Sequence, residues 1–262
     1  TCGSVLNVWK RVEAYARDGF TALIHGKYYH EETRATASQV HRYPDGRYLV
    51  VRDMDEARIV CEYIEGRGGR AAFLARFGGK AASPDFDPDL HLARVGVANQ
   101  TTMLARESLA IADEVGAAIE RARGAEYRAA NFRSFDTICS ATQDRQDAVN
   151  ALLQEPLDLM LVIGGYNSSN TMSLAALCAE RVPTYHIEAP EAIDVALGTV
   201  RYRPAGLHTS EMTHGGWLPE GAVRVGLTAG ASTPNSKIGE TVARLLALRG
   251  VEPAELLVRR AS

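Results

Sequence analysis

The chain has 262 residues, of which 46% are hydrophobic and 23% charged, and its formal net charge is −3. This length suffices for one large domain or two smaller ones, each with its own hydrophobic core. The small negative charge excludes a general electrostatic hold on nucleic acid or on an anionic membrane. We expect a cytoplasmic protein, since no apolar run is long enough to span a membrane and the first residues do not resemble a secretory signal.

Helix and strand patterns alternate along the first half of the chain. Hydrophobic periodicity predicts helices over Ser4–Arg17, Met54–Ile64 and Leu104–Arg123, and strands over Thr21–Ile24, Tyr48–Arg52 and Arg94–Ala98. Residues 66–92 are richer in Gly, Pro and Asp, so we expect the least regular structure there. A break around Asn131–Asp136 marks the best candidate for a domain boundary.

The alternation resumes after this break. We expect helices over Ala141–Gln154, Ser169–Arg181 and Ser236–Ala247, and strands over Leu157–Ile163, Thr184–Ile187 and Ala222–Leu227. The Gly- and Pro-rich segment Ala189–Glu220 is predicted to be a long connection, which in a compact domain is usually functional or mobile. The whole pattern predicts two α/β units with parallel sheets covered by helices.

The four cysteines are widely spaced and form no CxxC pair, so no disulfide scaffold is expected. Cys61 and Cys178 fall on the apolar faces of predicted helices, which predicts inert packing in the core. Cys2 and Cys139 stand among small and polar residues at the starts of predicted helices. A helix N-terminus favours the thiolate that binds metal, but spacing alone leaves both ligation and packing open for these two.

Polar loops follow two predicted strands in the second half, at the strand ends where open α/β sheets bind ligands. Residues 164–170 read Gly-Gly-Tyr-Asn-Ser-Ser-Asn, and residues 228–234 read Thr-Ala-Gly-Ala-Ser-Thr-Pro. Glycines allow tight turns, and free N–H groups at a helix N-terminus favour an anion. Simple N-capping by Ser or Asn is the alternative for the first loop.

Two more polar loops follow predicted strands in the first half. Residues 99–102 read Asn-Gln-Thr-Thr, and residues 25–33 read His-Gly-Lys-Tyr-Tyr-His-Glu-Glu-Thr. Three hydroxyl-rich strand ends without a basic cluster indicate phosphate recognition by neutral hydrogen bonds and helix ends. The His and Glu residues of the fourth loop offer a proton donor and acceptor, with a solvated surface pair as the alternative.

These motifs together resemble the 4-hydroxy-3-methylbut-2-enyl diphosphate reductase family. The resemblance rests on the segment Asp136–Val149 around Cys139, on Asn-Ser-Ser-Asn at 167–170, and on the loops at 99–102 and 228–234. The loop at 25–33 is similar to the cyanobacterial and plant branch of that family. The motifs occur in family order, and the similarity covers nearly the whole chain.

The resemblance implies a three-domain, trefoil-like α/β enzyme around a central 4Fe–4S cluster. Three cysteines would hold three irons, and the fourth iron would bind the hydroxyl oxygen of the substrate. Residues 1–136 would form the second domain and residues 137–262 the third, with Cys2 and Cys139 as the matching cluster ligands. The first domain, with its cysteine and a histidine-bearing loop, is expected before Thr1.

The implied reaction is reductive removal of an allylic hydroxyl, which gives water and isopentenyl and dimethylallyl diphosphates. Electrons would come from a ferredoxin or flavodoxin, and Glu32 would donate the proton. By the same residue-by-residue match, the substrate and its diphosphate would be bound by six residues: His30, Thr101, Ser168, Ser169, Asn170 and Ser232.

The chain departs from the family pattern at the cluster. Neither Cys61 nor Cys178 lies in a matching motif, and Gly3 follows Cys2 where the family usually has Pro. The sequence is therefore compatible with a fragment of an active reductase, or with a shortened homologue that binds a diphosphate or a partner without redox chemistry. A hydrolase or transferase that uses His30 and Glu32 is a third hypothesis.

Overall fold

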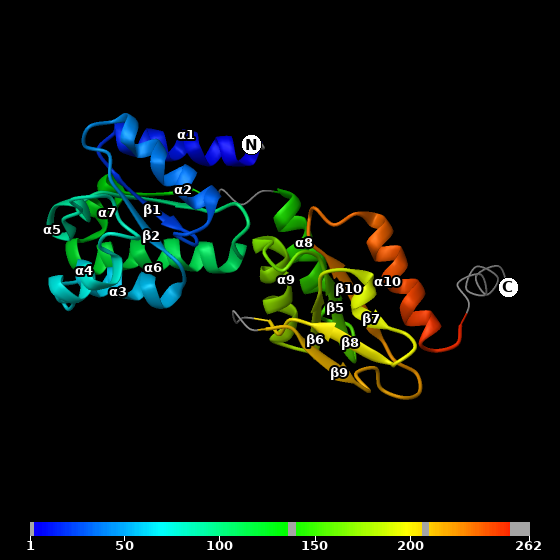
Figure 1. Cartoon of the computed structure of the whole chain (residues 1–262). Coiled ribbons are helices and arrows are strands. Elements are labelled where there is room, and N and C mark those ends of the chain that lie inside the picture. Colours follow the sequence, from blue (N-terminus) through cyan, green and yellow to red (C-terminus); the bar gives the residue numbers. More distant parts are fainter. Residues whose placement is uncertain (1–2, 136–139, 206–209, 252–262) are drawn as a thin grey trace. The chain divides into compact units, whose positions relative to one another are not determined.

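The computed structural model describes residues 3–135, 140–205 and 210–251 (Figure 1). The chain divides into two compact units, residues 1–140 and 141–262. The interpretation of residues 1–136 and 137–262 as the second and third domains of a reductase stays a prediction. No helix in the described ranges has the length and apolar character needed to cross a membrane.

Unit 1 is built on a parallel sheet with the strand order β2-β1-β3-β4. Its strands are β1 (Thr21–His25), β2 (Tyr48–Val51), β3 (Val95–Asn99) and β4 (Phe132–Ser134). The helices are α1 (Gly3–Arg17), α2 (Glu31–Ser38), the 3-10 helix η1 (Gln39–Arg42), α3 (Met54–Ile64), α4 (Arg70–Phe77), α5 (Pro88–His91), α6 (Ala105–Arg123) and α7 (Ala125–Asn131). In Figure 1, α1 and α2 lie on one side of the sheet and α3 and α6 on the other.

The core of unit 1 lies on both faces of this sheet. Strands β1 and β3 are buried along their whole length, as expected for central strands of a parallel sheet. Helix α6 buries Ile111, Val115 and Ile119, spaced four residues apart, so that one face packs inward. Asp53 caps α3 by accepting a hydrogen bond from the Glu56 N–H at 3.0 Å, which fixes the start of that helix.

Unit 2 contains two small sheets. The parallel sheet has the order β10-β5-β6, with β5 (Leu159–Ile163), β6 (Thr184–Ile187) and β10 (Val225–Ala229). Its helices are α8 (Ser140–Leu152), α9 (Ser169–Ala179) and α10 (Asn235–Ala247). The 3-10 helix η2 (Pro190–Ala192) precedes an antiparallel sheet of β7 (Ile193–Asp194), β8 (Thr199–Tyr202) and β9 (Met212–Gly215).

The prediction of parallel sheets covered by helices is confirmed. Helix α3 and strand β6 have the bounds that the sequence predicts, and most other predicted elements differ by one or two residues. Strand β10 is the exception, because it begins at Val225, three residues later than predicted, and runs on to Ala229, so that it includes Thr228 and Ala229 of the predicted loop. The loop therefore begins at Gly230.

Several elements were not expected. Helix α4 lies in the stretch predicted to be least regular, where Phe73 and Phe77 are its buried residues. Helix α2 begins at Glu31, inside the loop predicted for residues 25–33. Strand β4 falls in the predicted break, and residues 189–220 contain the antiparallel sheet instead of a structureless connection.

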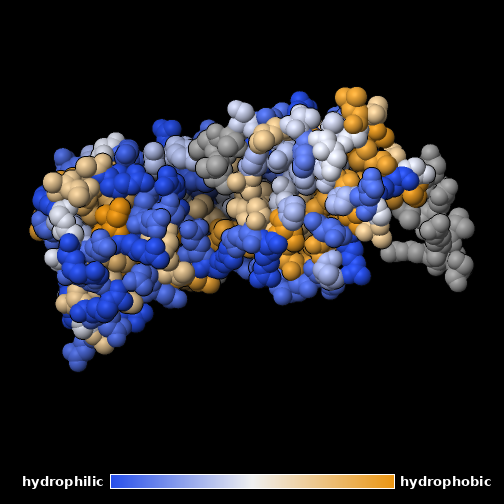
Figure 2. Space-filling model, turned by 90° about the horizontal axis from the view of Figure 1, so that it is seen from below, coloured by the Kyte–Doolittle hydropathy of each residue, from blue (hydrophilic) through white to orange (hydrophobic). Residues whose placement is uncertain are grey.

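Figure 2 shows hydrophobic side chains gathered on unit 2, where the described residues also line an apolar groove. The groove has a volume of about 430 Å³ and lies between β10, an edge strand of its sheet, and α10. Its lining includes Leu218, Val225, Leu245 and Leu246. None of the predicted site residues lines this groove, so it is separate from the candidate site.

Candidate functional site at the carboxyl ends of the strands

In unit 1 the predicted residues gather where β1 and β3 end. The two strands are parallel neighbours, and the Gln100 N–H donates to the His25 carbonyl at 2.8 Å, which joins their carboxyl ends. Glu32 lies in the first turn of α2, and its Oε1 accepts a hydrogen bond from the Thr101 N–H at 2.6 Å. The fold thus brings Glu32 and Thr101, 69 residues apart in the sequence, into direct contact.

His30 is the N-cap of α2. Its backbone is extended, with φ −77° and ψ 137°, and its Nδ1 accepts a hydrogen bond from the Glu32 N–H at 3.2 Å. A nitrogen that accepts carries no proton, so the neutral ring has its N–H at Nε2. The side chain is half-buried and offers that N–H as a donor.

His25, in contrast, has a structural environment. Its side chain is fully buried, its Nδ1 lies 2.7 Å from the Ser108 hydroxyl, and its Nε2 lies 3.8 Å from the Glu107 carboxylate. Burial lowers the pKa of His25 to about 4, because the imidazolium loses its hydration, although the nearby Arg52 carbonyl and Asp53 oppose this shift. Burial also raises the pKa of Glu107. His25 is therefore neutral near pH 7.

We expect the stability of the protein to fall as the pH drops from about 6.5 towards 4. The unfolded chain binds a proton on His25 below its ordinary pKa of about 6.5, whereas folded His25 stays neutral down to about 4. The cost by linkage is about 3 kcal/mol. Urea denaturation at several pH values should show a flatter dependence for His25→Gln than for the parent chain. Parallel curves for the two proteins would contradict this assignment.

In unit 2 the first set of predicted residues surrounds the turn from β5 into α9. Gly164 has a φ of +147°, a region that side chains rarely adopt, and a Cβ added there would lie only 2.8 Å from the hydroxyls of Thr171 and Thr233. Ser168 caps α9 by accepting a hydrogen bond from the Thr171 N–H at 3.3 Å. Simple N-capping, the alternative to ligand binding, therefore explains Ser168 but not the other polar residues of the loop.

The next residues of α9 carry polar groups that capping does not explain. Ser169, Asn170 and Thr171 are at most 5% exposed. Within the described part of the chain, three of their polar atoms are buried without a hydrogen-bond partner: Ser169 Oγ, Asn170 Nδ2 and Thr171 Oγ1. Burying such groups unpaired is costly, so their concentration at one helix N-terminus fits a site that a ligand completes.

The second loop of unit 2 packs against the first. The Gly230 N–H donates to the Ile163 carbonyl at 2.9 Å, and Asn170 Oδ1 accepts from the Ala231 N–H at 3.0 Å. Ser232, the predicted binding residue of this loop, is exposed. The structure therefore brings the loops at 164–170 and 230–234 together at the carboxyl ends of two neighbouring parallel strands.

Gly230→Ala should destabilise the protein, because a Cβ at this position would overlap the Thr171 hydroxyl. Overpacking of this kind costs about 1–3 kcal/mol. Gly239→Ala is the matched control, since Gly239 lies within α10 and an added Cβ would have no neighbouring atom within 4 Å. The control should gain about 0.5–1 kcal/mol of helix stability. Urea denaturation of both variants checks this pair, and a Gly230→Ala protein as stable as the parent would refute it.

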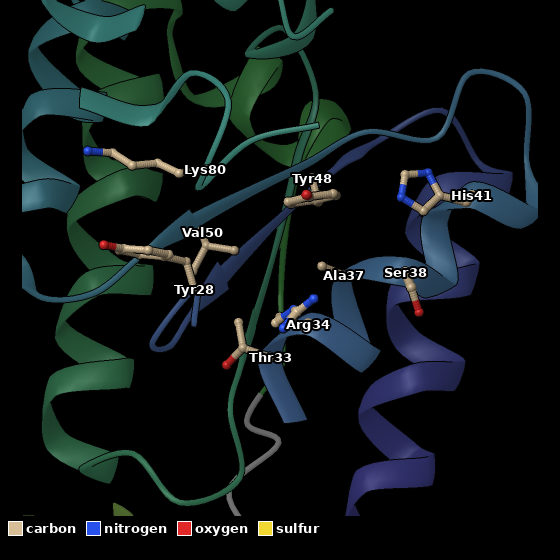
Figure 3. A pocket seen from close by; sticks show the side chains of 9 residues that line it. All are labelled: Tyr28, Thr33, Arg34, Ala37, Ser38, His41, Tyr48, Val50 and Lys80. Atoms are coloured by element: carbon tan, nitrogen blue, oxygen red, sulfur yellow. The ribbon is translucent and has the colours of Figure 1, made fainter. Parts of the chain in front are cut away.

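Each unit also has a cavity beside its candidate site residues. A cavity of about 170 Å³ lies in unit 1 between α2, η1 and β2. Figure 3 shows side chains that line it, among them Arg34, His41 and Tyr48. Neither His30 nor Glu32 nor Thr101 lines it. In unit 2 a cavity of about 310 Å³ lies at the carboxyl end of β10, and Gly230, Thr233 and the cationic Arg145 are among its lining residues.

The cysteines divide into two classes. Cys61 and Cys178 are buried free thiols in α3 and α9, which confirms the prediction of core packing. Burial raises the pKa of both thiols to about 12, so they are neutral near pH 7 and unsuited to bind iron. The predicted ligands Cys2 and Cys139 lie outside the described residues. Among the residues that are described, no group of three or more His, Cys, Asp or Glu side chains could hold a metal ion.

This donor set does not fit a cluster held by three cysteines of this chain alone. Of four cysteines, two are neutral core thiols, which leaves Cys2 and Cys139 as candidate ligands.

The sequence analysis did not single out two buried polar residues that the structure places at the candidate site. Gln100 and Thr171 stand inside or beside the quoted motifs, but only the tertiary contacts distinguish them from their neighbours.

Fold and site together define an α/β protein of parallel sheets whose polar groups gather at the carboxyl ends of the strands. The chain belongs to the LytB protein family, which matches residues 1–246. This membership confirms the family resemblance read from the motifs.

The chain is similar to curated cyanobacterial proteins named 4-hydroxy-3-methylbut-2-enyl diphosphate reductase. It is 49% identical to the protein of Gloeobacter violaceus over 96% of this chain and 58% of that protein. It is 48% identical to the protein of Synechococcus sp. strain RCC307 over 95% of this chain and 59% of that protein. The chain thus spans less than two thirds of the length of these relatives.

A solved structure supports the fold. The E-1-hydroxy-2-methyl-but-2-enyl-4-diphosphate reductase of Plasmodium falciparum matches 94% of this chain and 58% of that chain, with a TM-score of 0.61. The identity is 19%, so this likeness concerns the fold alone.

Proposed function

We propose that this chain is part of a 4-hydroxy-3-methylbut-2-enyl diphosphate reductase of the methylerythritol phosphate pathway. The enzyme converts its substrate to isopentenyl and dimethylallyl diphosphates. Membership of the LytB family and identities of 46–49% to curated reductases over 95–96% of this chain support the proposal. The structural observation that carries it is the set of buried, unpartnered polar atoms at the start of α9.

In this proposal unit 2 holds the diphosphate. Ser168, Ser169 and Asn170 lie at the N-terminus of α9, where free N–H groups and the helix dipole attract an anion. The Asn170 side chain is held by its Oδ1, which accepts from the Ala231 N–H, so its Nδ2 is free to donate to a phosphate oxygen. Ser232 adds an exposed hydroxyl from the neighbouring loop.

Unit 1 supplies the proton chemistry in the same proposal. The reaction adds two electrons and two protons to the allylic alcohol: the C–O bond breaks, oxygen leaves as water and a C–H bond forms. Glu32 donates the proton that turns the leaving hydroxyl into water, a typical general-acid role. Thr101 and the Nε2–H of His30 bind the substrate next to this carboxyl group.

The electrons enter from outside the described residues. We propose a 4Fe–4S cluster as their carrier, with Cys2 and Cys139 as two of its ligands and a third thiolate from the part of the relatives that this chain does not match. A ferredoxin or flavodoxin is the proposed donor. We also propose a cytoplasmic location, in keeping with Cys61 and Cys178 being free thiols.

The diphosphate site can be tested on this chain with inorganic pyrophosphate as the probe. Asn170→Asp keeps the shape and the Oδ1 acceptor but replaces the Nδ2 donor by a negatively charged oxygen. Isothermal titration calorimetry should show pyrophosphate affinity reduced about 10- to 100-fold, the loss of a hydrogen bond to a charged group. The charge control is Asn150→Asp, an exposed position on α8, which should bind like the parent. Equal affinities for all three proteins would refute the role of α9.

The alternative function is diphosphate binding without redox chemistry. This alternative is favoured because Cys2 and Cys139 are the two cysteines of this sequence that are not buried neutral thiols of the described core. Both functions predict the same effect of Asn170→Asp on pyrophosphate affinity. They differ in reductase turnover, which only the first function predicts for a protein that joins this chain to the part of the relatives that it does not match.

A further inference from the structure

Gln100 has an unusual place between the two loops of the unit 1 site. It follows β3 directly and is 1% exposed. Its Oε1 accepts hydrogen bonds from the Lys27 N–H at 3.2 Å and from the Thr33 hydroxyl at 2.9 Å. Its Nε2 donates to the Thr102 hydroxyl at 2.8 Å. One buried amide therefore joins the β1–α2 turn to the β3–α6 turn.

The contacts of Gln100 bracket Glu32 in the sequence. Lys27 precedes Glu32 at the start of the turn, and Thr33 follows it in α2. The Gln100 backbone N–H also donates to the His25 carbonyl at the end of β1. The carboxylate of Glu32 then accepts from Thr101, the residue next to Gln100. Gln100 thus contacts the backbone turn on both sides of Glu32 and directly precedes the residue that donates to its carboxylate.

Gly26 shows how closely the two turns approach. A Cβ at Gly26 would lie 2.7 Å from the Thr33 hydroxyl and 3.1 Å from the Gln100 Cβ. The small residue therefore lets the amide of Gln100 reach Thr33. The hydrogen bond between Thr33 and Gln100 joins two buried groups and is costly to break, which favours a single arrangement of the turn.

We propose that Gln100 is a positioning residue for Glu32, which holds the carboxyl group against the Thr101 N–H. This proposal rests on the proposed function for the role of Glu32 in turnover. The side-chain hydrogen bonds of Gln100 all go to groups of the protein itself. Gln100 acts through Thr33, Lys27 and Thr101, and both ends of its amide are needed, since Oε1 accepts two hydrogen bonds and Nε2 donates one.

The first test uses this chain and amide hydrogen exchange. Gln100→Met keeps the approximate shape and removes all three side-chain hydrogen bonds. The Thr101 amide should exchange at least about 10-fold faster relative to the Val97 amide in the middle of β3, which corresponds to about 1.4 kcal/mol for one hydrogen bond. Gln39→Met is the matched control, because Gln39 is also buried in unit 1 but donates only to the Ala35 carbonyl and the Ser38 hydroxyl. Unchanged Thr101 exchange in Gln100→Met overturns the proposal.

A second pair of variants tests the same connection if Gln100→Met does not fold. Thr33→Val removes the hydroxyl that donates to Gln100 and should also speed Thr101 exchange. Thr33→Ser keeps that hydroxyl and should restore protection. Equal exchange rates in Thr33→Val and Thr33→Ser overturn the proposed connection through Gln100.

The second test measures turnover in a complete reductase that carries this chain. Gln100→Met should lower kcat about 10-fold or more, with KM within about twofold, since misplacing a catalytic group affects the chemical step. The solvent deuterium isotope effect should increase, because proton transfer becomes slower. Faster Thr101 exchange with unchanged kcat and isotope effect overturns the positioning role. Lack of turnover in the unsubstituted complete protein overturns the proposed function and with it this role, while the exchange data still show whether Gln100 holds the turn.

Discussion

Anaerobic reconstitution of this chain alone with iron and sulfide should give little or no stable cluster and no reductase turnover. Cys61 and Cys178 are buried neutral thiols with pKa values of about 12, so Cys2 and Cys139 are the two cysteines left for iron. Two thiolates hold a four-iron cluster poorly and leave it open to solvent and oxygen. Iron and acid-labile sulfide per chain, together with the visible absorbance, provide the measurement.

The control for this prediction is a set of cysteine variants in a complete reductase. Cys61→Ala and Cys178→Ala should keep the cluster, because these side chains only pack in α3 and α9. Cys2→Ser and Cys139→Ser should lose it. A brown protein from this chain alone, with persistent iron–sulfur absorbance and full turnover with a reduced donor, would overturn the two-cysteine account.

Glu32→Gln in a complete reductase should keep substrate binding and lose turnover by about 10²- to 10⁴-fold, the range expected for removal of a general acid. The amide has the same shape and can still accept from the Thr101 N–H, but it has no acidic proton to give to the leaving oxygen. Steady-state kinetics and direct titration with the substrate separate these two effects.

The neighbouring carboxylate offers a close control for this substitution. Glu31 is exposed in the same first turn of α2. Glu31→Gln therefore removes the same negative charge from the helix N-terminus as Glu32→Gln does. It should leave kcat within about twofold of the parent, the range of surface substitutions. If Glu32→Gln retained full turnover, or if both variants lost it equally, Glu32 would not be the proton donor.

In the proposed function, neutral side chains in each unit would bind a charged ligand. Its polar groups come from strand ends and helix starts, where backbone N–H groups are free and small residues allow close approach. Gly164 and Gly230 leave space for Thr171 and Thr233 between two loops of unit 2. In unit 1 the Thr101 N–H donates to the Glu32 carboxylate, and the side-chain amide of Gln100 accepts from Thr33 in the same turn of α2.

Local patterns were reliable where one chemical preference dominates. The acidic residues at the start of α3 and the short segment Thr184–Ile187 that forms β6 gave the correct bounds for both elements. The patterns failed where packing overrides composition. Helix α4 forms in a Gly-rich stretch because Phe73 and Phe77 are buried, and the antiparallel sheet of β7, β8 and β9 forms between distant segments.

The motifs in the sequence, in their order along the chain, by themselves determined the family. The resemblance to that family then gave Glu32, His30, Thr101 and the loop at 167–170 as candidate site residues. Only the tertiary structure decided which side chains meet. It placed the Glu32 carboxylate on the Thr101 N–H, enclosed Gln100 between two turns, and left Ser169 and Asn170 with buried unpartnered atoms. These facts depend on the register of parallel strands, which joins residues far apart in the sequence, and on burial, which no local pattern encodes.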